Sequence, residues 1–109
     1  MMIKMNYKRI NVLINGVSAG ILEESEDGKR YRFTYKDNYT GESVSFAMPV
    51  QKKIWEFEKF PEYFENLLPE GLMLDGLCKM NEIIKNDYFS QLIAAGKNLF
   101  GNIEIKEIK

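Results

Sequence analysis

The stretch from Phe60 to Gly71, F-P-E-Y-F-E-N-L-L-P-E-G, constrains the fold of this chain more than any other segment. Two aromatic residues and two leucines recur at positions i, i+1, i+4 and i+5, the spacing of one face of a short helix. These residues are Tyr63, Phe64, Leu67 and Leu68. Pro69 ends this turn because proline lacks a backbone N–H and disfavours helical geometry in the residue before it. We therefore expect a second helix to begin at Pro69 and to share one apolar surface with the first.

The second helix continues with apolar residues at helical spacing, namely Leu72, Met73, Leu77 and Met80. Methionines at such positions usually fill gaps in a core, so we expect Met73 and Met80 to be buried. Cys78 lies on the same helix without a neighbouring base, and we expect a buried, inert thiol.

A third helix is predicted from Tyr88 to Ala95, with Asn86-Asp87 as its cap and Gly96 as its end. One of its faces carries two aromatic and two aliphatic side chains. They belong to Tyr88, Phe89, Leu92 and Ile93.

The N-terminal half has the pattern of antiparallel strands. Lys8 to Ile14 and Val17 to Glu24 flank Asn15-Gly16, the pair best suited to a type I′ hairpin turn. Gly20 in the return strand indicates a bulge or a close backbone approach. After a turn at Asp27-Gly28, residues 29–36 alternate strictly, with Tyr31, Phe33 and Tyr35 on one side.

Three further segments are less regular. Val44 to Phe46 is expected to form a short fourth strand, and Gly101 to Ile108 a late strand that returns to the sheet. The segment from Val50 to Lys59 has neither helical nor strand periodicity. The prediction is one domain over residues 1–109, of the α+β class, in which a small antiparallel sheet packs against about three short helices.

Composition limits the possible functions. The 109 residues carry 15 basic and 16 acidic side chains, so the net charge of -1 gives no surface for neutralising phosphates, and no direct nucleic-acid partner is expected. No apolar run approaches the roughly 20 residues of a membrane span. With one cysteine and no apolar leader at the start, a cytoplasmic location is expected.

Reactive side chains are scarce. The chain has no histidine, which removes the usual general base and the commonest metal ligand, and it has no glycine-rich phosphate loop. The carboxylates of Glu23, Glu24 and Glu26 at a strand end are expected to form a solvated rim. We therefore expect no enzymatic activity, no cofactor and no metal ion.

Trp55, the only tryptophan, leaves two interpretations open. Its ring could fold back onto the sheet as a lid. Alternatively it could point outward as an anchor for a partner, since tryptophan is enriched among residues that dominate interface energy.

The order of these motifs resembles the N-terminal subdomain of HipA-type serine/threonine kinases. The resemblance rests on Asn15-Gly16 with Gly20, on Phe33-x-Tyr35, on S-V-S-F-A-M-P and on F-E-N-L-L-P-E-G, and it extends from about Asn11 to Asn102. The alanine and glycine run of that family is partly present from Ala94 to Gly101, where Asn98 stands in place of a usual aspartate.

In those kinases the phosphate loop, the catalytic aspartate and the metal-binding aspartate lie downstream of this subdomain, and none can be placed in this sequence. A free-standing copy is similar to the HipS-type antitoxins of tripartite HipBST systems. The resemblance then implies a HipT-like kinase as partner, inhibited in trans, with a HipB-like helix-turn-helix protein possible in a ternary complex. The alternative is a structural subunit that stabilises the kinase without inhibiting it.

We expect the partner-binding residues to lie between Val50 and Phe60, close to the nucleotide cleft of the kinase. Trp55 is the expected central anchor, and Ile54, Phe57 and Phe60 are the expected neighbours.

Overall fold

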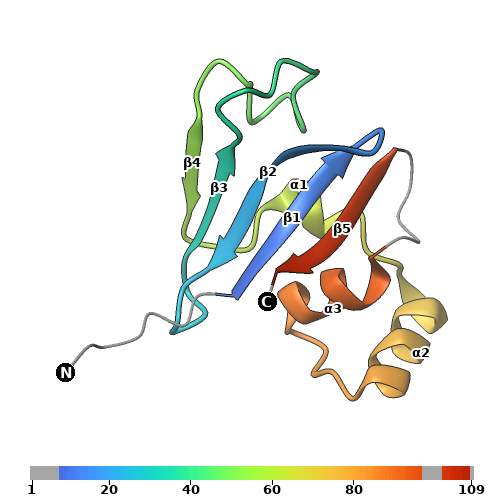
Figure 1. The fold of residues 1–109 in the computed structure, drawn as a ribbon. Coiled ribbons are helices and arrows are strands. Elements are labelled where there is room, and N and C mark those ends of the chain that lie inside the picture. Colours follow the sequence, from blue (N-terminus) through green and yellow to red (C-terminus); the bar gives the residue numbers. More distant parts are fainter. Residues whose placement is uncertain (1–7, 97–101, 109) are drawn as a thin grey trace.

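The structure is a computed structural model that describes residues 8–96 and 102–108 (Figure 1). Asn98 and most of the glycine run at residues 94–101 therefore lie outside the described residues, as does the expected start of the late strand at Gly101. These described residues form five strands and three helices. In order they are β1 (Lys8–Ile14), β2 (Val17–Glu24), β3 (Tyr31–Tyr35), β4 (Ile54–Phe57), α1 (Glu62–Glu65), α2 (Gly71–Asn81), α3 (Tyr88–Ala95) and β5 (Ile103–Ile108).

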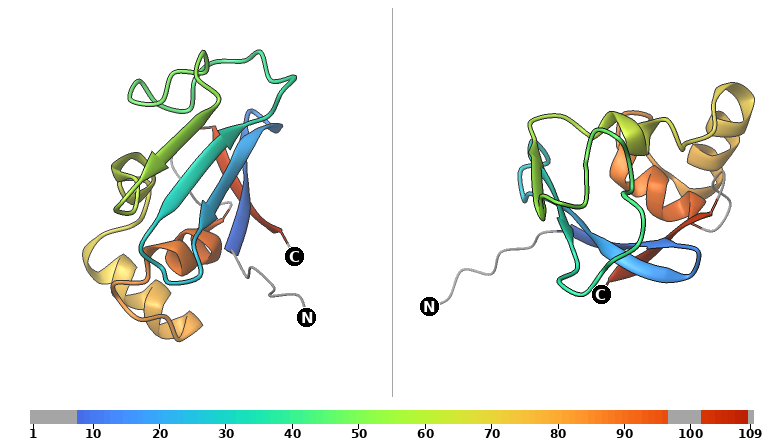
Figure 2. Two further views of the ribbon diagram at one scale, coloured as in Figure 1. Left: turned by 90° about the vertical axis from the view of Figure 1, so that its left-hand side faces the viewer. Right: turned by 90° about the horizontal axis from the view of Figure 1, so that it is seen from above.

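The strands form one sheet in the order β4-β3-β2-β1-β5, and every neighbouring pair is antiparallel. The helices gather on one side of this sheet, and α2 projects from the end of the molecule (Figure 2). The predicted α+β class, with a C-terminal strand added to N-terminal hairpins, is confirmed.

The β1–β2 hairpin has the predicted turn and bounds. Asn15 and Gly16 both have positive φ, 53° and 81°, as a type I′ turn requires. Gly20 combines the two predicted roles. The register moves from Val12 opposite Gly20 to Leu13 opposite Ser18, which leaves a bulge beside Gly20. A Cβ at Gly20 would also lie only 2.7 Å from Cζ of Phe33.

The core lies between the inner face of the sheet and helices α1 and α3. Phe33 and Tyr35 of the alternating strand β3 are buried, as predicted, and the Phe33 ring packs against Phe64 of α1. The other fully buried large side chains come from the sheet, from α3 and from the β3–β4 connection. They belong to Ile10, Leu22, Met48, Phe89, Leu92, Gln91 and Val12.

The predicted fourth strand at Val44 to Phe46 is wrong. This segment contributes only an isolated bridge between Ser45 and Met48, with Val44 buried and Phe46 fully exposed. Its conformation follows from the buried hydroxyl of Tyr35, which accepts a hydrogen bond from the Val44 N–H at 2.9 Å and donates one to the Met48 carbonyl at 2.5 Å. The phenol thereby satisfies two main-chain groups that a strand would have paired in a ladder.

Strand β4 forms instead within the segment that had no predicted structure. It is an edge strand of four residues, and its Trp55 lies opposite Phe33 of β3. Its sequence I-W-E-F hides the alternation because the exposed Ile54 is apolar, like Trp55 and Phe57 on the other side of the strand.

Helix α1 has only four residues, so the predicted apolar face extends beyond its end. The face nevertheless lies against the core, as predicted. Phe64 and Leu68 are buried, and Tyr63 and Leu67 are half-buried. The second helix begins at Gly71 rather than at Pro69. Gly71 has a positive φ of 61°, which favours glycine, so Pro69 belongs to the turn before α2.

The expected shared apolar surface on α2 is wrong. Leu72, Met73 and Met80 are 75 to 88% exposed, and α2 buries only Cys78. The buried Cys78 thiol was predicted. The two methionines face solvent because α2 meets the rest of the molecule through its opposite side, which packs against α3.

Helix α3 has the predicted bounds, and the side chain of Asp87 accepts a hydrogen bond from the Ser90 N–H at its start. The helix ends at Gly96, with Phe89 and Leu92 fully buried. Strand β5 then places Ile103 and Ile105 in the core beside β1, as its alternation predicts. Within residues 8–96 and 102–108, no helix has the length and apolar character that a bilayer crossing requires.

Candidate functional site

The described residues bring no reactive constellation together. Within them, no three side chains of the histidine, cysteine, aspartate or glutamate types are grouped so that they could hold a metal ion. The free thiol of Cys78 is buried. The exposed apolar side chains and the edges of the sheet are the features of the described surface that a partner protein could contact.

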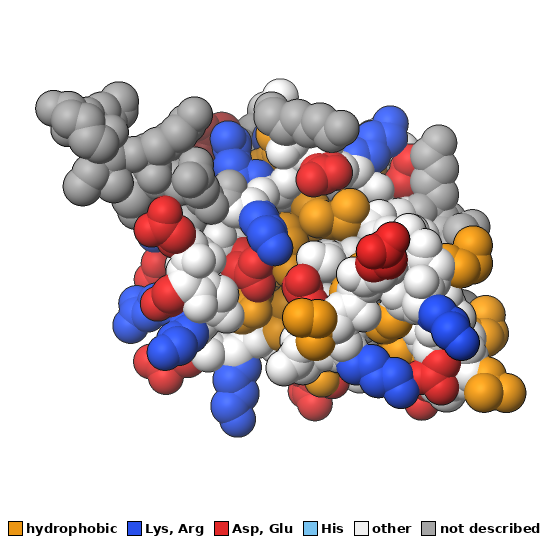
Figure 3. All heavy atoms as spheres, turned by 90° about the horizontal axis from the view of Figure 1, so that it is seen from below, with side chains coloured by type: hydrophobic (Ala, Val, Ile, Leu, Met, Phe, Trp, Pro, Cys, Tyr) orange, Lys and Arg blue, Asp and Glu red, His pale blue; other side chains and the backbone are white. Residues whose placement is uncertain are grey.

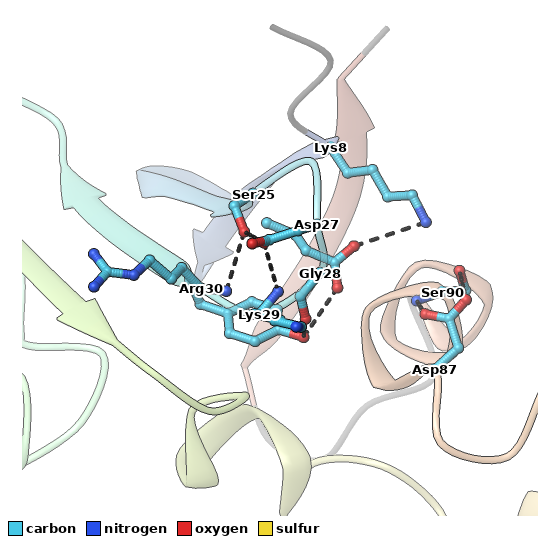
Figure 4. A network of polar contacts seen from close by, with 10 residues as sticks. Lys8, Ser25, Asp27, Gly28, Lys29, Arg30, Asp87 and Ser90 are labelled. Atoms are coloured by element: carbon cyan, nitrogen blue, oxygen red, sulfur yellow. Dashed lines mark hydrogen bonds and ion pairs between the residues drawn. The ribbon is translucent and has the colours of Figure 1, made fainter.

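Polar contacts at the β2–β3 turn stabilise the turn itself (Figure 4). Asp27 accepts hydrogen bonds from the Ser25 hydroxyl and the Lys29 N–H, and these bonds lower the pKa of its carboxyl below the usual range. Glu24 does not belong to a solvated rim, because it is 8% exposed and accepts a hydrogen bond from the Tyr31 hydroxyl at 3.0 Å. Burial raises the pKa of Tyr31. These groups form a structural network.

Trp55 lies on the helix-covered side of the sheet, where it packs half-buried against the core. Its indole N–H donates to the carbonyl of Lys52 at 2.8 Å and to that of Pro49 at 3.2 Å. The ammonium group of Lys52 lies 4.5 Å from the ring centroid, within range of a cation–π interaction. The ring therefore has the position of a lid over the core, while part of it stays accessible.

The four residues of the expected partner-binding set do not form one exposed surface. Ile54 points to the opposite side of β4 from Trp55 and is 48% exposed. Phe57 shares the side of Trp55 and is half-buried. Phe60 is 8% exposed and packs edge-to-face on Tyr31 with 5.3 Å between the ring centroids. Ile54 and parts of Trp55 and Phe57 are open to a partner, whereas Phe60 is buried.

A larger set of exposed apolar side chains lies on α2 and the turn after it, and its helical members were expected to belong to the shared apolar surface. We call it the α2 patch. It consists of Leu72, Met73, Met80 and Ile84, which are 73 to 88% exposed. Apolar side chains also appear at this end of the molecule in the space-filling view (Figure 3). Gly76 lies on the same helix, and a Cβ added there would meet nothing within 4 Å.

The helical spacing of the α2 patch was visible in the sequence, but its exposure was not. An apolar stripe that faces a partner has the same period as one that faces its own core. A local signal was Gly76, because glycine in a helix interior is unfavourable and no contact among the described residues requires it.

Comparisons with known proteins agree with this geometry. A family model described as the HipA N-terminal domain matches residues 10–106. An uncharacterized protein of Haemophilus influenzae is 29% identical over 98 residues, which cover 90% of this chain and 91% of the relative. A solved structure described as the N-terminal domain of HipA toxin superposes with a TM-score of 0.75 at 22% identity, over 98% of each chain. This last similarity establishes the fold.

Proposed function

This chain belongs to the HipA N-terminal domain family, and on that premise we propose that it is an antitoxin that binds and inhibits a HipT-like serine/threonine kinase in trans. It has no catalytic activity of its own in this proposal, and it acts in the cytoplasm. A HipB-like helix-turn-helix protein would complete a ternary complex and contact the DNA.

The observation that carries this proposal is the α2 patch. Four large apolar side chains, each at least 73% exposed, lie together on one helix and the turn after it. Large apolar side chains exposed on one helix and its following turn are suited to protein–protein contacts. A domain of this family that offers no assembled reactive groups within its described residues, but an uncovered apolar helix, is suited to docking onto a larger protein.

Within the complex, we assign the segment 50–60 to the kinase cleft. Ile54 and the accessible part of Trp55 would contact the kinase, and Phe57 and Phe60 would support them from beneath. Occupation of the cleft would hinder nucleotide binding or hold the kinase lobes apart in an unproductive arrangement.

The test is co-expression of this chain with a HipT-like kinase from the same organism, followed by size-exclusion chromatography and an autophosphorylation assay. The proposal expects one co-eluting complex and a loss of autophosphorylation as the chain is added. A complex with unchanged or increased autophosphorylation would identify the alternative, a stabilising subunit. If the two proteins elute separately, the proposal is wrong.

Paired variants test segment 50–60 as a contact surface. Ile54→Glu should weaken the complex because it places a charge in the assigned cleft contact, whereas Val17→Glu, at a 57% exposed position on β2, should bind like the wild type. Trp55→Ala should weaken binding by about 2 to 4 kcal/mol if the ring is an anchor. Thermal melting of each variant shows whether it is folded. Equal affinity of the wild type, Ile54→Glu and a folded Trp55→Ala would remove segment 50–60 from the interface.

A further inference from the structure

The two edges of the sheet differ in how well they are protected. At the β5 edge, three of six residues are charged, namely Glu104, Lys106 and Glu107, and the Ile105 N–H donates to the Gly96 carbonyl at 3.2 Å. At the β4 edge, the sequence I-W-E-F carries one charge and no proline or lysine. Natural sheets usually protect an edge with charged residues, lysine above all, or with proline, because an open edge pairs with other chains.

The main-chain N–H and C=O groups of β4 point alternately toward β3 and away from the sheet. The Lys53 carbonyl accepts a hydrogen bond from the Tyr35 N–H at 2.9 Å, so Tyr35 and Lys53 form a hydrogen-bonded pair. By the alternation of an antiparallel ladder, the main-chain groups of Trp55 and Phe57 also point toward β3. Those of Ile54 and Glu56 point away from the sheet. Figure 1 shows no other described segment along this side of β4.

The C-terminal end of this edge is acidic, although Glu56 is also paired with Arg32 of β3 at 3.2 Å. A hollow of about 850 Å³ lies beside the end of β4, between that strand, α1 and the start of α3. It is lined by four glutamates against one lysine. The charged residues are Glu56, Glu58, Glu62, Glu65 and Lys59. Aromatic side chains of Phe57, Phe60 and Tyr88 complete the lining, so the hollow combines negative charge with rings that attract cations.

We propose that the free edge of β4 binds an extended, basic segment of a partner protein by β-strand addition. The added strand would exchange main-chain hydrogen bonds with Ile54 and Glu56. Apolar side chains on one of its faces would pair with the exposed Ile54, and lysine or arginine side chains on the other would reach the acidic hollow. Electrostatic complementarity selects a basic segment over an acidic one. For the identity of the natural partner this inference rests on the proposed kinase complex, but its test does not require the kinase.

The test is an NMR titration of the ¹⁵N-labelled full chain with a synthetic lysine–valine octapeptide of alternating sequence. The amide signals of Ile54 and Glu56 should shift, and their hydrogen exchange should slow in the bound state. A glutamate–valine octapeptide should bind at least about tenfold more weakly because its charge has the wrong sign. The lysine–valine peptide methylated at every main-chain nitrogen should not bind, since it cannot donate to the edge.

A pair of variants tests the same edge from the protein side. Glu56→Pro removes an N–H that points away from β3, so the sheet is expected to tolerate it, and it should reduce peptide affinity about tenfold relative to Glu56→Thr. Glu56→Thr is the matched control, since both variants lose the same carboxylate.

Three results would overturn strand addition. They are no binding of the lysine–valine peptide, shifts confined to residues away from β4, or equal binding of the methylated peptide. The methylated peptide keeps the test decisive even if Glu56→Pro does not fold. A kinase complex that forms although the peptide fails would leave the proposed function intact, and a peptide that binds although the kinase fails would leave strand addition intact.

Discussion

The phenol of Tyr35 is predicted to hold the long β3–β4 connection on the core, and Tyr35→Phe tests this. The substitution preserves the ring, which is 1% exposed, and removes one oxygen. That oxygen donates to the Met48 carbonyl and accepts from the Val44 N–H, and both of these residues are buried. Each main-chain group left without a partner costs about 1 to 3 kcal/mol.

The sum, allowing for partial access of water, is a loss of about 2 to 4 kcal/mol in the free energy of unfolding. For a domain of this size the melting temperature should fall by roughly 10 to 25 °C. Urea denaturation followed by circular dichroism measures the first quantity, and calorimetry the second.

Tyr39→Phe is the matched control. Its hydroxyl also bonds a carbonyl, that of Glu42 at 2.7 Å, but the contact is exposed and water can replace it. We expect a change within about 0.5 kcal/mol. If Tyr35→Phe is as stable as Tyr39→Phe, the two buried bonds do not hold the connection, and the explanation given for the missing strand at residues 44–46 is wrong.

Three further predictions concern the fold. Gly20→Ala should destabilise by about 1 to 3 kcal/mol, because the new methyl meets Phe33 and the main chain of Thr34, whereas Gly76→Ala in open space should stabilise α2 by about 0.5 to 1 kcal/mol; equal effects in urea denaturation would contradict the glycine assignments. Asp87→Ala should remove about 1 kcal/mol by loss of the helix cap and Asp87→Ser should retain most of it, as compared by thermal melting; equal losses would disprove capping. Burial raises the pKa values of Tyr31, Tyr35, Tyr39 and Tyr63, so the folded state holds their protons more tightly than the unfolded state. The free energy of unfolding should therefore fall as pH rises above about 10, and urea midpoints that are equal at pH 9 and pH 11 would contradict this.

The sequence allowed prediction of the elements in which local chemistry and burial agree. Asn15-Gly16 favours a two-residue type I′ turn between antiparallel strands, and the strands on both sides have the predicted bounds. Asp87 and Gly96 mark the two ends of α3 in the same way. In each case a residue with a strong conformational preference stands next to a clear apolar period.

The prediction was wrong where a long-range contact decides the structure. The conformation of residues 44–48 depends on hydrogen bonds to the Tyr35 hydroxyl. This partner is at least nine positions away, and no local pattern reveals it. The exposure of the α2 patch likewise depends on how α2 sits against α3. At the candidate site, the enrichment of tryptophan in interfaces led to the prediction of segment 50–60 as the contact. The direction in which each of its side chains points depends on the pairing of β4 with β3.

The position of β1 has a consequence for the synthesis of this protein. On one side β1 pairs with β2, which follows after a two-residue turn, and on the other with β5, which comes from the far end of the chain. The meander of the first four strands can form early, but until β5 docks, the main-chain groups of Arg9, Asn11 and Leu13 that face it stay unpaired. A neighbouring nascent molecule can supply the same strand, which is the geometry of domain swapping. Strand-exchanged dimers should therefore become more common as the concentration of unfinished molecules rises.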